Sequence, residues 1–193
     1  MDRETTTLLQ QAKAGSGDAM NLLFEHIAER LLAFIRLRMG SRLRSRMESR
    51  DILQASMLKA FEHLEQLKGE KSESLMAWLA RIAENEIRDQ ADFQGRRRRD
   101  IDRSVPIENE EDRALKAQVR SQVSQVIFSD QMRKLEKAIE DLDLDYREII
   151  MLRKLEELSY REIGERLGKS ADACRMLLAR AMTAVAIKMK ESA

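Results

Sequence analysis

The chain has 193 residues, of which 43% are hydrophobic and 36% charged, with a formal net charge of +1. This length and apolar content suit a globular protein of one domain or two small ones. Aromatic residues make up only 4% and there is a single proline, so we expect an all-α fold. A single cysteine excludes an internal disulfide, and two histidines are too few for an ordinary zinc site, so we expect no metal and no cofactor.

The beginning of the chain predicts helices and no targeting segment. The opening stretch MDRETTTLLQQ lacks the apolar core of a signal peptide, and no apolar run approaches the roughly 20 residues that span a bilayer. We therefore expect a cytoplasmic protein without membrane insertion. A helical pattern begins near Thr7, stops at AGSGD, restarts after Ser16 as a plausible N-cap, and continues to Gly40, a natural C-cap.

Two further long helices are predicted in the first half of the chain. One runs from about Arg50 to Lys68, and the other from Leu75 to Phe93, after the polar loop GEKSES. Three amphipathic helices of this length can enclose a core. The sequence therefore predicts a first helical domain over residues 1–95.

The helix that begins at Arg50 carries apolar side chains on two stripes. The expected core stripe consists of Leu53, Met57, Phe61 and Leu64. A second stripe, about a third of the way round the helix, consists of Asp51, Gln54, Leu58 and Glu62. An apolar Leu58 rimmed by polar groups suggests a docking site for another protein. Single exposed leucines are common, however, and the stripe taken alone favours that simpler interpretation.

The helix from Leu75 to Phe93 carries a polar and basic strip beside its apolar face. The strip consists of Arg81, Asn85, Arg88 and Asp92, and it leads into the arginines at 96–99. Such a strip can follow a nucleic-acid backbone, and Asn85 can hydrogen-bond a base edge. A solvated helix face of mixed charge explains the same pattern equally well.

Helical periodicity fails from Gln94 to about Asp112, where there is almost nothing to bury. This predicts a flexible linker over residues 96–128, with a further helix possible on the pattern Leu115, Val119, Val123 and Ile127. A second helical domain is predicted over residues 129–193. It begins near Ser129 and includes a helix from Leu144 to about Glu157.

The segment SYREIGERLGKSADACRMLLARA has the pattern of a helix-turn-helix. Ser159 and Glu162 form an S-x-x-E capping box, Gly168 can end the first helix in a left-handed conformation, and Ser170 can start the next. In such motifs the N-terminal end of the second helix enters the major groove of DNA. The predicted duplex contacts are Ser170, Ala171, Asp172, Arg175, Met176 and Arg180. An ordinary αα-hairpin with solvated arginines is the alternative, and Cys174 is expected to be buried.

These motifs together resemble the sigma-70 family of bacterial RNA polymerase sigma factors, in its small extracytoplasmic-function (ECF) type. ESRDILQASMLKAF resembles the family's region-two helix, MAWLARIAENEIRDQ resembles its promoter-melting helix, and residues 142–181 resemble its region four. Gly164 stands where the family often has alanine. The segment 105–128 is longer than expected, and it either threads toward the polymerase active centre or folds against a neighbouring domain as a regulatory helix.

The resemblance implies a promoter-specificity subunit of RNA polymerase that is not an enzyme and has no catalytic residues. It implies that Asp51, Gln54 and Leu58 contact the clamp helices of the beta-prime subunit, with the beta subunit as a further partner. The implied contacts to the unpaired strand of the minus-ten element, with the loop GEKSES, are Arg81, Asn85, Arg88, Arg96 and Arg97. Region four would read the minus-thirty-five element as duplex DNA, and an anti-sigma factor is a further candidate partner.

Two other classes of function stay open at this point. The first is a helix-turn-helix transcriptional regulator that binds DNA without polymerase. The second is a helical adaptor or anti-sigma-type protein that binds no specific DNA sequence. Enzyme classes are disfavoured because there is no Gly-rich phosphate loop, nucleophile elbow or cluster of metal ligands in the sequence.

Overall fold

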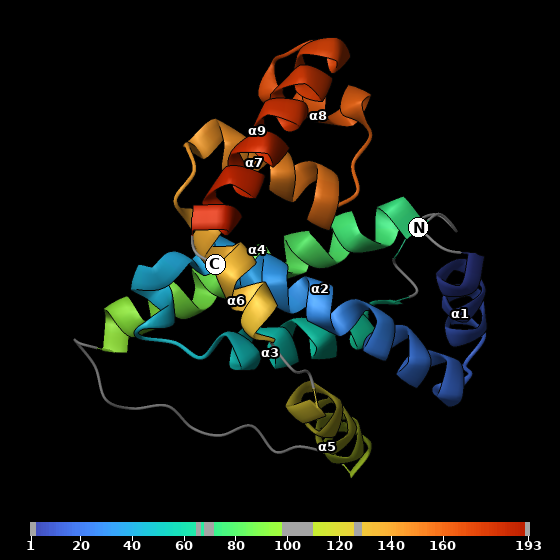
Figure 1. Cartoon of the computed structure of the whole chain (residues 1–193). Coiled ribbons are helices and arrows are strands. Elements are labelled where there is room, and N and C mark those ends of the chain that lie inside the picture. The colour runs from blue at the N-terminus through green and yellow to red at the C-terminus, as the bar shows by residue number, and fades with distance from the viewer. Residues whose placement is uncertain (1–2, 65–66, 68–71, 98–109, 126–128, 192–193) are drawn as a thin grey trace.

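The structure is a computed structural model that describes residues 3–64, 67, 72–97, 110–125 and 129–191. Over these residues every regular element is helical and no strand occurs, as the sequence predicted (Figure 1). In chain order the elements are α1 (Arg3–Lys13), α2 (Gly17–Arg44), α3 (Ser49–Glu62), α4 (Ser72–Arg97), α5 (Glu110–Gln125), α6 (Asp130–Glu140), α7 (Leu144–Ile150), the π-helical turn η2 (Met151–Leu155), α8 (Tyr160–Leu167) and α9 (Ala171–Glu191).

The first core is built around α2, with α1, α3, α4 and α5 against it. Ser16 caps α2 as expected, because its side chain accepts a hydrogen bond from the Ala19 backbone N–H at 3.3 Å. Phe34 and Leu53 are fully buried in this core. The rings of Phe24 on α2 and Phe61 on α3 stack with centroids 4.1 Å apart, which fixes the crossing of these two helices.

Three helix boundaries differ from the sequence prediction. α2 does not end at Gly40: that residue has φ +62°, which breaks the helix locally, and the helix resumes to Arg44. α3 ends at Glu62 rather than Lys68, although Leu64 and Leu67 are buried. Leu64 and Leu67 come after the end of α3 and still pack in the first core. The spacing of these leucines in the sequence therefore indicated burial and not a longer helix. α4 is longer than predicted at both ends.

The further helix that the sequence allowed in the linker is α5, and it packs against α3 and the first half of α2. Val119 and Val123 are buried in the first core, and Gln118 donates a hydrogen bond to the Asn21 side chain. The rest of the predicted linker falls mostly at 98–109 and 126–128, which lie outside the described residues. Residues 110–125 therefore belong structurally to the first unit.

The second core is formed by α6 to α9, with Ile149, Leu152, Ile163 and Cys174 fully buried. The helix predicted from Leu144 to about Glu157 is helical as far as Leu155, but its last five residues form the π-helical turn η2 instead of continuing α7. This wider turn has a clear consequence for packing. Met151 belongs to the first core and its neighbour Leu152 to the second, so η2 joins the two units.

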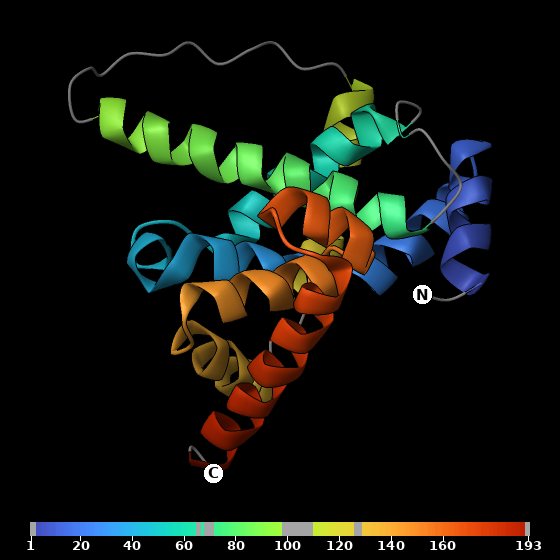
Figure 2. The same ribbon diagram turned by 90° about the horizontal axis from the view of Figure 1, so that it is seen from above.

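The two helical units lie directly against each other. α6 and η2 contact α2, and seen from above the second unit rests across α2 (Figure 2). The described residues contain no helix that is both long and apolar enough to span a membrane.

Candidate functional site

The helix-turn-helix has both of its helix starts fixed by side chains. The capping box of α8 is complete: the Ser159 N–H donates to the Glu162 carboxylate at 2.7 Å, and the Glu162 N–H donates to the Ser159 hydroxyl at 3.3 Å. The Ser159 hydroxyl also donates to the Glu162 carboxylate at 2.6 Å, and this bond, together with that from the Ser159 N–H, holds the pKa of the Glu162 carboxyl below its usual value. Gly168 ends α8 with φ +65°, and the Ala173 N–H donates to the Ser170 hydroxyl at 3.1 Å to start α9.

The outward face of α9 carries the residues predicted to contact duplex DNA. Five of them are exposed and Ala171 is half-buried; the exposed ones are Ser170, Asp172, Arg175, Met176 and Arg180. Arg175 forms an ion pair with Asp172, and its guanidinium lies 5.2 Å from the centre of the Tyr160 ring. This arrangement holds Arg175 at the N-terminal end of α9, the part of such a helix that meets base edges in the major groove.

The opposite side of the same helix packs in the second core. Cys174 is buried there, as the sequence predicted, together with Leu178 and Ala181, and Leu177 packs partly against this core. Behind α8, the buried carboxylate of Glu156 accepts from Arg166 at 2.9 Å. Burial raises the pKa of the Glu156 carboxyl, while Arg166 and Arg38 oppose the shift.

The strip on α4 is exposed over its whole described length. Arg81, Asn85 and Arg88 share one outward face, while Leu79 and Ala83 on the opposite face are buried in the first core. Arg96 and Arg97 form the end of α4, and their side chains lie outside the described residues. Of the loop GEKSES, residues 69–71 also lie outside, whereas Ser72–Ser74 form the first turn of α4 and are not loop.

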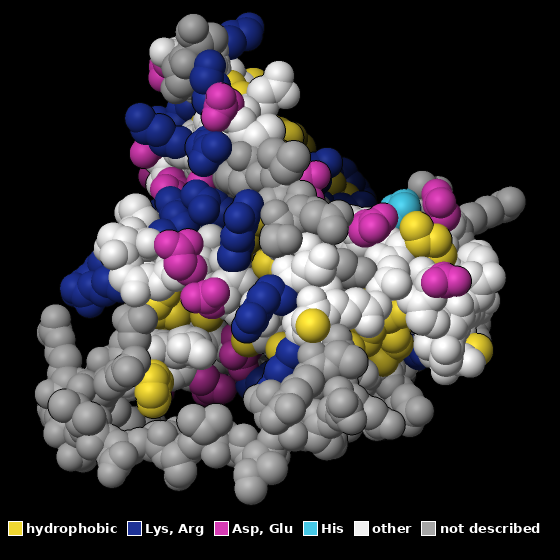
Figure 3. Space-filling view, turned by 90° about the horizontal axis from the view of Figure 1, so that it is seen from below, with side chains coloured by type: hydrophobic (Ala, Val, Ile, Leu, Met, Phe, Trp, Pro, Cys, Tyr) yellow, Lys and Arg dark blue, Asp and Glu magenta, His cyan; other side chains and the backbone are white. Residues whose placement is uncertain are grey.

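The side chains of the outer stripe on α3 differ in their exposure to solvent. Asp51 is exposed and Gln54 is half-buried. Leu58 is also half-buried and packs against the first core, so it is not the freely exposed apolar anchor that was predicted. Helix α5 also packs against α3. Figure 3 shows both basic and acidic side chains among the described residues of the face seen from below.

The three predicted surfaces lie on α3, α4 and α9 and do not converge on one pocket. This arrangement suits contacts with large partners at several places better than chemistry on a small substrate. No group of three or more residues that could hold a metal ion occurs in the described part of the chain.

One set of residues escaped the sequence prediction. Arg30, Arg36, Arg38 and Arg44 on α2 each contact a glutamate of the second unit. The partners are 96 to 127 residues away along the chain, so no local pattern could have identified them.

Comparison with known proteins accounts for both units. Residues 23–98 match the family model described as Sigma-70 region 2, and residues 132–185 match the one described as Sigma-70, region 4. The ECF RNA polymerase sigma-E factor of Salmonella typhimurium is 28% identical over 95% of this chain and 93% of its own length. The ECF RNA polymerase sigma-E factor of Haemophilus influenzae is 29% identical over 82% of this chain and 80% of its own length. The chain belongs to the sigma-70 family, in its ECF group.

The region-2 match covers most of α2 and all of α3 and α4, and the region-4 match covers α6 to the middle of α9. α5 lies between the two matches. Among solved structures, the sigma factor RpoE of Bartonella quintana, in complex with the anti-sigma factor NepR, is 22% identical over 86% of this chain and 94% of that chain, with a TM-score of 0.48. Sigma factors are transcription initiation factors rather than enzymes.

Proposed function

We propose that this sigma factor binds core RNA polymerase through region 2 and holds two separate promoter elements, one melted and one duplex. One observation carries the proposal: exposed polar surfaces are left on α3, α4 and α9 after both cores are filled, and they follow the family's regions in order. On this proposal the functional domains are 1–95 and 129–193, joined through 96–128. The chain acts in the cytoplasm and catalyses no reaction itself.

The polymerase contact is assigned to α3. The exposed carboxylate of Asp51 and the half-buried Gln54 and Leu58 form a polar surface with a small apolar part. Such a surface suits the side of a helix in the clamp of the beta-prime subunit, and the beta subunit is a second contact in the same enzyme.

The two DNA contacts differ in the state of DNA that they bind. The strip of Arg81, Asn85 and Arg88, continued by Arg96 and Arg97, meets the unpaired strand. Extruding a base costs a few kcal/mol of stacking, so the strip favours strand opening only if it binds the single strand better than the duplex. On α9, Arg175 and Arg180 meet the duplex, with Ser170, Ala171, Asp172 and Met176 beside them.

An anti-sigma protein is the further partner that we assign. RpoE of Bartonella quintana is bound to the anti-sigma factor NepR in its structure, and we propose a regulator of the same class for this chain.

The test is reconstitution with bacterial core polymerase. Purified chain added to core enzyme should form a complex and produce transcripts whose start sites depend on the chain. The double variant Asp51→Ala with Gln54→Ala should weaken the complex by about 1–3 kcal/mol, measured by fluorescence anisotropy. Both changes are of polar side chains, Asp51 exposed and Gln54 half-buried, and neither removes an apolar side chain from the first core, so the helix content should be unchanged. The variant Glu165→Ala, on the exposed side of α8, serves as a control.

A second pair of variants separates the polymerase contact from the DNA contact. Arg175→Ala with Arg180→Ala should keep the affinity for core polymerase and lose promoter-dependent transcripts. If the wild-type chain bound promoter DNA but never core polymerase, the proposal would be wrong and a polymerase-independent regulator would replace it.

A further inference from the structure

The guanidinium of Arg175 is held at a defined place on the outward face of α9. It forms an ion pair with the carboxylate of Asp172, one turn nearer to the start of the helix, and lies 5.2 Å from the centre of the Tyr160 ring. Tyr160 is the first residue of α8, so these contacts tie Arg175 to both helices of the helix-turn-helix. An arginine on an exposed helix face ordinarily samples many rotamers, whereas this one is restrained by two partners.

The Tyr160 ring is itself held by a second guanidinium. Arg153 on η2 lies 5.1 Å from the centre of the ring and donates a hydrogen bond to the Leu158 carbonyl at 3.0 Å. The main chain next to the ring is fixed as well, because the capping box at Ser159 begins α8. The ring therefore contacts two arginines, of which only Arg175 belongs to the face that was predicted to meet DNA.

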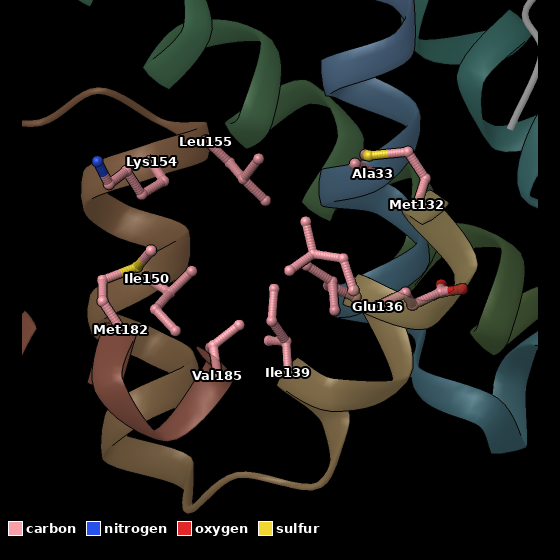
Figure 4. Close-up of a pocket in the computed structure, with 11 residues that line it drawn as sticks. Ala33, Met132, Glu136, Ile139, Ile150, Lys154, Leu155, Met182 and Val185 are labelled. Carbon is pink, nitrogen blue, oxygen red and sulfur yellow. The ribbon is translucent and has the colours of Figure 1, made fainter. Parts of the chain in front are cut away.

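The element that carries Arg153 is fixed by apolar packing. Leu152 is fully buried in the second core, and Figure 4 shows Leu155 turned into the hollow between α2, α6 and α9. Residues two apart along a helix point to roughly opposite sides, so Arg153 projects away from this hollow and toward Tyr160. The series of contacts from η2 through Tyr160 to Arg175 therefore starts from a buried anchor.

The acidic partner indicates which part of DNA Arg175 contacts. A phosphate contact depends mainly on positive charge, but Asp172 offsets the charge of Arg175 and would repel a phosphate placed beside it. A base edge is read by hydrogen bonds whose directions must match, so a restrained guanidinium with an acidic neighbour suits a base better than a phosphate. The place of Arg175 near the start of α9 agrees with this, because the N-terminal residues of a recognition helix meet base edges.

Guanine is the base whose edge matches a fixed arginine. Its O6 and N7 atoms both accept hydrogen bonds in the major groove, and a guanidinium donates to them as a two-pronged fork. Adenine presents a donor beside its N7 atom, which repels one prong of the fork. The hydrogen bond from Arg175 to Asp172 uses Nη1, so Nε and Nη2 supply the donors of the fork.

We propose that Tyr160 is a positioning residue for the reading of DNA: together with Asp172 it fixes Arg175 for bidentate contact with one guanine of the duplex promoter element. A side chain that is ordered before binding loses less entropy on DNA, and it cannot turn to a neighbouring base or phosphate. This role of Tyr160 rests on the proposed function of α9 as the duplex contact, and it adds which base is read and what selects that base.

The positioning is tested in the free chain, without DNA. Tyr160→Leu keeps an apolar side chain against the second core and removes the aromatic face, whereas Tyr160→Phe keeps the ring and removes only the hydroxyl. Nuclear magnetic resonance relaxation of the Arg175 Nε–Hε group should show an order parameter that falls toward the flexible range, below about 0.6, in Tyr160→Leu. Tyr160→Phe should keep the wild-type value, as should the control Glu165→Ala, an exposed change on α8. Equal values in all of these chains would overturn the role of Tyr160.

The choice of base is tested with the complete polymerase complex. The chain is combined with core polymerase, the duplex element upstream of its transcripts is located, and each base pair of that element is replaced in turn. In Arg175→Ala the preference for guanine at one base pair should fall about 5–150-fold, while the preferences at the other positions persist. Tyr160→Leu should lower the same preference about 2–5-fold. Tyr160→Phe and Glu165→Ala should leave it unchanged.

Two results with promoter DNA would contradict the guanine contact. A uniform loss of transcript from every promoter in Tyr160→Leu would mean that the residue is only structural, and an unchanged guanine preference in Arg175→Ala would mean that this arginine reads no base. If the wild-type chain gave no promoter-dependent transcript, the proposed function would fail and the guanine contact with it. The relaxation of Arg175 would still decide whether Tyr160 holds the guanidinium in place.

Discussion

At the scale of single residues, Gly164 shows how closely the two helices of the helix-turn-helix approach. A Cβ atom placed on Gly164 would lie 2.5 Å from the carbonyl oxygen of Lys169, which belongs to the turn and cannot rotate away. In the sequence, Gly164 was notable only because the family often has alanine at this position. In this chain the turn after α8 has closed over the space that a methyl group needs.

We predict that Gly164→Ala destabilises the chain by about 1–3 kcal/mol, because the backbone of the turn must shift. The strain outweighs the roughly 1 kcal/mol by which alanine stabilises a helix interior relative to glycine, so the net effect is a loss of stability. Gly17→Ala is the matched control: Gly17 is also in a helix, and a methyl group there would meet nothing within 4 Å. Urea unfolding should show a lower midpoint for Gly164→Ala only, and equal midpoints would show that the turn adapts freely.

At the scale of elements, an ion pair joins α3 and α4, and only its acidic partner is buried. Glu86 on α4 is 5% exposed, and the ammonium of Lys59 on α3 is its ion-pair partner. The hydrogen bond to Glu86 raises the pKa of Lys59 above its usual value, against the effect of partial burial. The pair aligns the helix assigned to polymerase with the helix assigned to the melted strand.

We predict that Lys59→Met destabilises the chain by about 1–3 kcal/mol, since it leaves the Glu86 carboxylate buried without its cation. The value is below that of a fully buried pair, because the Lys59 side chain is 47% exposed and solvent screens the interaction. Adding Glu86→Leu to Lys59→Met should restore most of the stability, as measured by thermal unfolding. No recovery in the double variant would mean that the pair does not explain the loss.

At the scale of the whole molecule, the segment between the two family regions is not simply a tether. α5 packs against α3 and α2, and its side chains Val119 and Val123 are only 1% and 5% exposed. Of the two roles left open for this segment, folding against a neighbouring domain is the one that its described part adopts. Threading into the polymerase would first require these valines to leave the core.

We predict that Val119→Ala and Val123→Ala each destabilise the first unit by about 1–3 kcal/mol, through lost apolar burial and the cavity that remains. Amide hydrogen exchange should show lost protection in α5 before it is lost in α2. Arg120→Ala, an exposed change in the same helix, should leave exchange as in the wild type. If both valine variants exchanged like the wild type, α5 would not be docked in solution.

Local signals in the sequence determined the helical class, the helix-turn-helix and its caps, and the stripes that carry the candidate contacts. Ser16, Ser159, Glu162 and Gly168 act within a few residues of themselves, so their effects could be read directly. The order of these motifs also sufficed to indicate the family. Boundaries were less certain, because the spacing that buries Leu64 and Leu67 does not require a helix.

Only the tertiary structure decided how the two units and α5 are placed. Arg36 and Glu136 are 100 residues apart along the chain. The sequence contains many arginines and glutamates and does not by itself show which of them form pairs. The partial burial of Leu58 likewise depends on its packing against the first core, which is assembled from several helices. Short-range hydrogen bonds and periodic burial are set by neighbours along the chain, whereas docking between surfaces is set by shape and charge in three dimensions.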